Sequence, residues 1–227
     1  VTFSAIAFNR KGIERAVAAG AGEIAVGTAA SETFSQRNTN CTIAESLARV
    51  AEICELARQR GLRVRGYVST VLGCPYEGEI DPSLVADLAA RMVELGCYEI
   101  SLGDTIGVGT PAKAQIMIDR VAEKVPHEQL ALHFHDTYGQ ALANIVACLE
   151  RGVAVVDSSV AGLGGCPYAP GAACNVASED VLYLLDGLGI ESGVNLEKLA
   201  AAGRFITGQL GRPSVSRVAQ ALESQQH

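Results

Sequence analysis

The chain has 227 residues and a formal net charge of −7, with 48% hydrophobic and 19% charged residues. This balance excludes an intrinsically disordered chain, and the length suffices for one α/β domain with its own core. The acidic charge and the lack of a basic block exclude a nucleic-acid partner or a membrane-surface partner. No apolar run reaches the roughly 18 residues of a membrane span, and the first residues do not resemble a signal peptide. The composition predicts a soluble, compact protein.

Short apolar runs alternate with amphipathic stretches along most of the chain. The predicted strands are Phe3–Phe8, Glu23–Gly27, Leu62–Ser69, Tyr98–Leu102, Leu130–His135 and Val153–Ser158. The predicted helices between them are Lys11–Ala19, Ile43–Arg60, Pro82–Leu95, Pro111–Lys124 and Tyr138–Arg151. Several of these helices are followed by a glycine, which closes a last turn in the left-handed conformation. Successive βα units of this kind predict parallel strands joined by right-handed crossovers.

Two architectures fit this pattern: an open doubly wound sheet and an eight-stranded (β/α)8 TIM barrel. Polar, glycine-rich segments follow the strands rather than precede them, and only a barrel gathers such segments on one face. We therefore expect a single TIM-barrel domain over residues 1–227 that lacks its first two βα units, because the sequence supplies six strands and begins in one of them. Three further helical patterns, at Glu179–Leu188, Asn195–Thr207 and Ser214–Glu223, predict a helical C-terminal extension from about residue 176.

A His-x-His pair forms the end of the fifth predicted strand. His133 and His135 are two residues apart, so their side chains point to the same face of the strand. Two convergent imidazoles suit a divalent metal whose other ligands are oxygens from neighbouring strands. A pair of hydrogen-bonded core histidines is the alternative. Asp136 follows them and either fixes a histidine tautomer or caps the next helix, with capping favoured.

Other polar residues at strand ends also have two interpretations. Asp104 can hold a substrate hydroxyl or a proton, or it can cap the following turn. Asn175 can bind a metal or cap a helix. Arg65 and Tyr67 share the inner face of one strand, and a buried arginine suits either an anionic ligand or an internal ion pair.

A glycine-rich loop over residues 162–168 reads GLGGCPY and carries Cys166. Such a pliable backbone can act as a lid that brings an acid or a base to the substrate; the alternative is a surface loop with an incidental thiol. The chain has seven cysteines and no C-x-x-C pair, so we expect free thiols in a reducing compartment and no structural zinc site.

Several of these segments resemble one family, the 3-hydroxy-3-methylglutaryl-CoA lyases. The resemblance rests on residues 159–168 (SVAGLGGCPY), 101–111 (SLGDTIGVGTP), 133–141 (HFHDTYGQA), 65–69 (RGYVS) and 73–78 (GCPYEG). It extends from about Lys11 to the C-terminus, and the cysteine loop is its most specific part. The His-x-His strand is shared with related metal-dependent aldol and Claisen enzymes.

The resemblance implies a βα barrel that cleaves 3-hydroxy-3-methylglutaryl-CoA to acetyl-CoA and acetoacetate with Mg²⁺ or Mn²⁺. It assigns His133, His135 and Asn175 as metal ligands, with His133 also catalytic. It further assigns Cys166 to proton transfer, Asp104 as a catalytic carboxylate, and Asn38 and Tyr67 to positions near the substrate. A homodimer is implied too. We expect a cytoplasmic location, with the mitochondrial matrix as the alternative.

The sequence departs from the family at one point, because it contains no Arg-Asp dipeptide. In the family this pair supplies an enolate-stabilising arginine and a further metal ligand on the first strand. Two alternatives to the lyase therefore stay open. One is a related acetyl-CoA-dependent enzyme that condenses 2-oxo acids, and the other is a catalytically impaired barrel that binds acyl-CoA or a partner chain.

Overall fold

The computed structural model describes residues 1–165 and 174–225. Within them, parallel strands form one sheet in the sequential order β1 to β6. The strands are β1 (Ser4–Ile6), β2 (Glu23–Ala29), β3 (Arg63–Ser69), β4 (Glu99–Asp104), β5 (Leu130–Phe134) and β6 (Val155–Asp157). This is a parallel α/β half-barrel, as the alternation of patterns predicts. Whether two further βα units complete a barrel stays a prediction.

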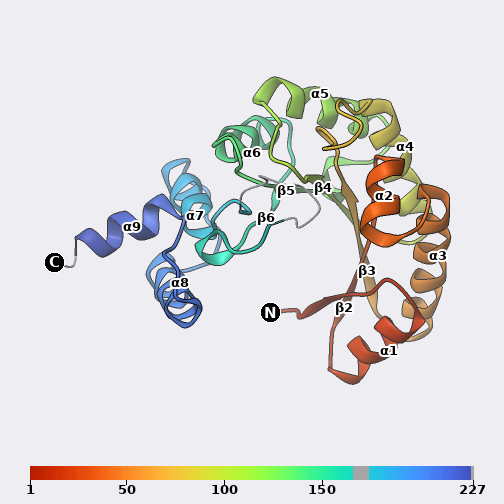
Figure 1. Cartoon of the computed structure of the whole chain (residues 1–227), viewed down its shortest axis with the longest axis horizontal. Helices are drawn as coiled ribbons and strands as arrows, with labels where there is room; N and C mark the ends of the chain where they lie inside the picture. The colour runs from red at the N-terminus through yellow and green to blue at the C-terminus, as the bar shows by residue number, and fades with distance from the viewer. Residues whose placement is uncertain (166–173, 226–227) are drawn as a thin grey trace.

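Helices cover the outside of the curved sheet, and the later ones lie beyond β6 (Figure 1). Those before β6 are α1 (Arg10–Ala18), α2 (Glu32–Thr39), α3 (Ile43–Gln59), α4 (Pro82–Glu94), α5 (Pro111–Ala122) and α6 (Ala141–Leu149). After it come α7 (Ser178–Gly187), α8 (Leu196–Leu210) and α9 (Arg217–Ser224). Short 3-10 turns, η1 (His127–Gln129) and η2 (Val160–Gly162), precede β5 and follow β6.

Local sequence explains where these helices begin and end. The Thr42 hydroxyl accepts the backbone N–H of Glu45, whose carboxylate accepts the N–H of Thr42, so a capping box starts α3. Asp81 caps α4 and Pro82 occupies its first turn. Gly61 and Gly96 follow helices with φ of 68° and 109°, as expected.

The main core lies between the outer face of the sheet and the helices. Along β5, Leu130, Leu132 and Phe134 alternate into this core and are fully buried. The intervening residues of β5 face the inner side of the sheet, because side chains alternate along a strand. The alternation therefore places His133 on the inner face of the sheet.

Three predicted boundaries and one omission need correction. Helix α6 begins at Ala141, not near Tyr138, because residues 136–139 form a turn in which the N–H of Gly139 donates to the Asp136 carbonyl. The strands predicted at Phe3–Phe8 and Val153–Ser158 are shorter, as β1 spans Ser4–Ile6 and β6 spans Val155–Asp157. Helix α2 was not predicted, since its sequence ETFSQRNT has little apolar periodicity; the Ser31 hydroxyl caps it by accepting the N–H of Phe34.

No helix in residues 1–165 or 174–225 has the length and apolar character needed to cross a membrane. Free thiols are confirmed for the six cysteines in this part of the chain, which form no disulfide.

Candidate active site

The two histidines at the end of β5 share the inner face of the sheet. Gly103 on β4 and Asp157 on β6 are the register partners of His133. The ring centroids of His133 and His135 are 5.7 Å apart, whereas Phe134 between them points into the core. The two-residue spacing of these histidines therefore places both imidazoles on one side of the strand, as predicted from the sequence.

Asn175 reaches the same place from a segment 40 residues further along the chain. It forms an isolated backbone bridge with His135, and the N–H of Val176 donates to the Phe134 carbonyl at 3.1 Å. The side-chain amide of Asn175 donates to the Leu163 carbonyl at 2.9 Å. Its Oδ1 atom is buried and has no hydrogen-bond partner among the described residues. Asn175 thus connects the loop at Leu163 to the end of the strand at His135, and its Oδ1 remains without a partner among the described residues.

The inner face of the sheet lines a cavity of about 550 Å³. Four of the residues predicted from the sequence line it together: Asn38, Tyr67, His133 and His135. Its apolar wall comes from the first half of the chain and includes Ile6, Phe8, Ala29 and Phe34. A mostly apolar cavity with a few convergent polar groups is the usual form of a small-molecule site. Asn175 does not belong to this lining.

Asp104 does not line the cavity either. It lies on the same face of β4 as Leu102 and is fully buried, with its carboxylate accepting the backbone N–H groups of Val108 at 3.2 Å and Gly109 at 2.8 Å. Burial raises the pKa of Asp104 to about 6, although the backbone donors oppose the rise. The geometry supports the turn-capping interpretation, and we do not count Asp104 among the groups that contact substrate.

Asp136 also caps, as favoured from the sequence. Its carboxylate accepts the N–H of Ala141, the first residue of α6, at 2.9 Å. This contact supports the capping interpretation.

The glycine-rich loop leaves the sheet through a tight turn after β6. Ala161 has a φ of 55° there, and its N–H donates to both carboxylate oxygens of the fully buried Glu179, at 3.0 and 2.9 Å. A buried acceptor of this kind holds the backbone in a conformation that a non-glycine residue adopts rarely. The loop then continues through Leu163, whose carbonyl accepts the hydrogen bond from the Asn175 side chain. Cys166, the thiol predicted to transfer a proton, lies outside the described residues.

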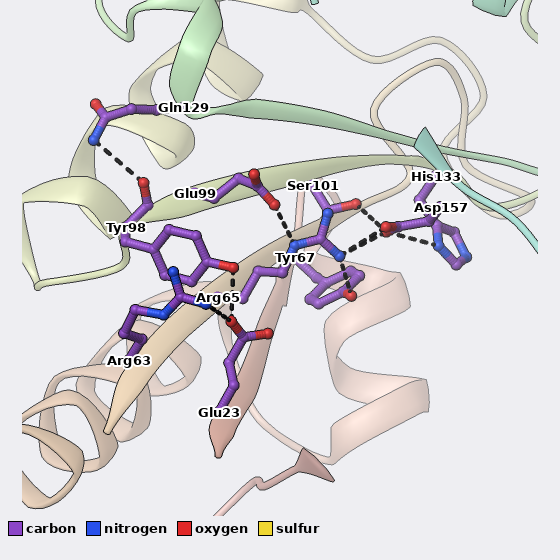
Figure 2. Close-up of polar contacts among 10 residues, drawn as sticks. All are labelled: Glu23, Arg63, Arg65, Tyr67, Tyr98, Glu99, Ser101, Gln129, His133 and Asp157. Atoms are coloured by element: carbon purple, nitrogen blue, oxygen red, sulfur yellow. Dashed lines mark hydrogen bonds and ion pairs between the residues drawn. The ribbon is translucent and has the colours of Figure 1, made fainter. Parts of the chain in front are cut away.

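A buried arginine lies at the centre of the inner face (Figure 2). Arg65 Nε donates to Glu99 at 2.5 Å, and its Nη1 donates to both oxygens of Asp157 at 2.8 and 3.0 Å. Nη1 also donates to the Tyr67 hydroxyl at 2.5 Å. Of the two roles predicted for a buried arginine, the structure shows the internal ion pair. The charges of Asp157 and the other partners outweigh burial and raise the pKa of Arg65.

Asp157 is a functional candidate that sequence reasoning missed. Burial by itself would raise its pKa, but the His133 imidazole, whose Nδ1 lies 3.4 Å from Oδ2, and the charge of Arg65 hold it below its ordinary value. The carboxylate also accepts the Ser101 hydroxyl at 2.7 Å. A signal was present, because Asp157 is the next-to-last residue of the strand predicted at Val153–Ser158, and a buried aspartate is rare without a partner.

These donors can form part of a divalent-metal site. Two imidazoles and the amide Oδ1 of Asn175, which is buried without a partner, are suitable ligands for Mg²⁺ or Mn²⁺ only if further oxygens complete the set. Among the described residues, no cluster of three or more histidine, cysteine, aspartate or glutamate side chains is arranged to hold a metal. The described residues therefore offer a divalent metal three ligands, two imidazoles and one amide oxygen, and no carboxylate.

Comparison with known proteins identifies the family. The family model described as HMGL-like matches residues 3–206. A Pseudomonas aeruginosa protein named 3-hydroxy-3-isohexenylglutaryl-CoA/hydroxy-methylglutaryl-CoA lyase is 60% identical over 98% of this chain and 74% of its own length. The mitochondrial hydroxymethylglutaryl-CoA lyase of Bos taurus is 58% identical over 97% of this chain and 68% of its own.

A solved structure agrees with the sequence matches. The crystal structure of hydroxymethylglutaryl-CoA lyase from Pseudomonas aeruginosa superposes with a TM-score of 0.96 at 59% identity, covering 99% of this chain and 75% of that one. The family match spans most of the chain, and the relatives exceed half identity over nearly all of it. The chain belongs to the HMGL-like family.

Proposed function

We propose that this protein is a metal-dependent lyase that cleaves 3-hydroxy-3-methylglutaryl-CoA into acetyl-CoA and acetoacetate. The observation that carries the proposal is that His133 and His135 line one cavity, while the backbone of Asn175, whose Oδ1 is buried without a partner among the described residues, bridges to His135. The chain is also 60% identical to a protein named for this activity. His133, His135 and Asn175 would hold Mg²⁺ or Mn²⁺. That ion would polarise the hydroxyl and carbonyl oxygens of the substrate.

The chain's own residues bind the acyl group and move protons. The apolar wall at Ala29 and Phe34 suits the methyl group and thioester arm, whereas Asn38 and Tyr67 offer polar groups to the oxygens. His133 has one lone pair, on Nε2, with which it would either bind the ion or take the proton of the tertiary hydroxyl as the carbon–carbon bond breaks, but not both at once. Acetoacetate forms on one side and the acetyl-CoA carbanion on the other. Cys166 would return a proton to that carbanion, which balances the reaction.

The proposed function extends to the metabolic role, the oligomeric state and the location of the protein. The reaction would serve leucine degradation, and the active form would be a homodimer. The location is proposed to be cytoplasmic, although the bovine relative is named as mitochondrial. The 227 residues contain no Arg-Asp dipeptide, so the arginine and the further ligand that the family resemblance implies have no counterpart within them.

The direct test supplies purified protein with 3-hydroxy-3-methylglutaryl-CoA and Mn²⁺ and measures acetoacetate. We expect metal-dependent product formation that falls by at least about a hundredfold in His135→Ala, because the substrate oxygens lose their polarising group. His127→Ala is the matched control, since His127 lies in η1 at the opposite end of β5. Product formation only from acetyl-CoA and a 2-oxo acid would favour the condensing enzyme. Acyl-CoA binding without turnover would favour the impaired barrel.

A further inference from the structure

The two edges of the His133 ring lie in different environments. Nδ1 is buried and lies 3.4 Å from Oδ2 of Asp157. No described residue makes a hydrogen bond of standard geometry with it, so this carboxylate is the acceptor placed to take its proton. The His133 side chain is nevertheless 33% exposed and lines the cavity. The other ring nitrogen, Nε2, lies on the side of the ring that faces away from Asp157 (Figure 2).

The Asp157 carboxylate can act only as an acceptor in this environment. Arg65, which is permanently charged, donates to both of its oxygens, and the Ser101 hydroxyl donates to Oδ2. An ionised carboxylate has no proton to donate. A hydrogen bond between Asp157 and His133 therefore requires the proton on Nδ1 and leaves a lone pair on Nε2.

The carboxylate is also held in place from the other side. Glu99 binds Nε of the same arginine, and Tyr67 accepts from Nη1, so the guanidinium has little freedom to move. Asp157 is the β6 register partner of His133, which fixes the two side chains side by side. The cluster connects β3, β4, β5 and β6 behind the reactive edge of one imidazole (Figure 2).

We propose that Asp157 is a positioning residue for the lyase, which holds the His133 proton on Nδ1 and so presents the Nε2 lone pair to the cavity. The proposal rests on the proposed function only for what Nε2 then does. Carboxylate partners of this kind raise the basicity of a ligating imidazole and fix its orientation. Arg65 contributes to the same positioning indirectly, because its hydrogen bonds to both oxygens of Asp157 hold that carboxylate in place beside His133.

The first test needs neither turnover nor metal. Long-range ¹H–¹⁵N correlation spectra of metal-free, ¹⁵N-labelled protein at about pH 8, above the ordinary histidine pKa of about 6.5, report the tautomer of each ring. We expect His133, assigned with His133→Gln, to be the Nδ1–H tautomer. An Nε2–H tautomer in the wild-type protein would overturn the proposal, whatever the activity assay shows.

The second test uses variants. In Asp157→Asn we expect His133 to move toward the Nε2–H tautomer and Mn²⁺ affinity to fall roughly tenfold to hundredfold. Glu99→Gln is the matched control, because it removes the other carboxylate from Arg65 without contacting His133; we expect it to keep the wild-type tautomer. An equal change in both variants would mean that the cluster is only structural and would contradict the proposal. If Asp157→Asn does not fold, the wild-type spectrum still decides.

Discussion

Two opposing effects of folding act on the pKa of the Asp104 carboxyl. Burial disfavours its charge, while two backbone N–H groups of the next turn stabilise it, and the balance raises its pKa from 3.8 to about 6. A carboxyl with a raised folded pKa favours the folded state at low pH. Its contribution is fully present below about pH 4 and is lost as the pH rises through about 6.

The difference between the two pKa values corresponds to roughly 3 kcal/mol. We therefore expect the free energy of unfolding of the wild-type protein, relative to Asp104→Asn, to decrease by about this amount between pH 4 and pH 7. Urea unfolding of both proteins in EDTA measures it. A difference that stays constant across this range would contradict the assignment of the raised pKa to Asp104.

Single residues also show where sequence reasoning ends. Period-two alternation is sufficient to place His133 and His135 on one face, and the same alternation turns Asp104 to the other face, since it is one residue out of phase with Gly103 and Thr105 in the cavity lining. The partners of Arg65 could not be derived, because Asp157 is 92 residues away. Only the register between β5 and β6 brings its carboxylate beside His133.

At the scale of elements, the loop after β4 is shaped by a glycine that touches the end of β5. Gly107 has a φ of 64°, and a Cβ atom there would lie 2.8 Å from the His135 carbonyl oxygen and 2.8 Å from the Thr137 nitrogen. Both are backbone atoms, which cannot rotate away. The loop after β4 can therefore approach the backbone of His135 and Thr137 this closely only with a glycine at position 107.

We expect Gly107→Ala to destabilise the protein by roughly 2 to 4 kcal/mol, combining the left-handed conformation with overpacking. Gly189→Ala is the matched control, because Gly189 has a φ of 72° and no atom lies within 4 Å of its Cβ position. It should cost only about 1 kcal/mol. Thermal unfolding of the two variants measures the difference, and equal losses would show that the close approach is unimportant.

The long amphipathic elements could be predicted from sequence, whereas the short polar ones could not. Helix α3 carries an apolar face and a capping box, so its start at Ile43 follows from local chemistry. Helix α2 has neither a long apolar face nor a glycine stop, and it ends at Asn40 in the left-handed conformation. Its packing against β2 and α3 stabilises it, and this is information that a single-sequence pattern does not contain.

For the whole molecule, the sheet ends in two open edges within the described residues. β1 pairs with β2, and β6 pairs with β5, and neither has a partner on its other side. Apolar side chains are exposed at the first edge, including Ile6 at 59% and Phe8 at 44%. Exposed strand edges of this kind pair with other chains.

We expect the isolated 227-residue polypeptide to associate through these edges, with an average mass in analytical ultracentrifugation that rises with concentration. Ile6→Lys should weaken the association, because a charged residue on an edge strand opposes pairing. Ile116→Lys is the matched control, since Ile116 is also 59% exposed but lies on α5, which packs between α4 and α6 on the outside of the sheet. Equal effects of both substitutions would assign the association to general surface hydrophobicity instead.

We propose that the metal binds where β5 meets the segment containing Asn175, and calorimetric titration of Mn²⁺ into the metal-free protein tests this placement. We expect one Mn²⁺ site per chain that is lost in His133→Ala and His135→Ala, weakened in Asn175→Ala and retained in His127→Ala. Mn²⁺ binding that persists unchanged without His133 and His135 would place the metal elsewhere in the protein and overturn the proposed site.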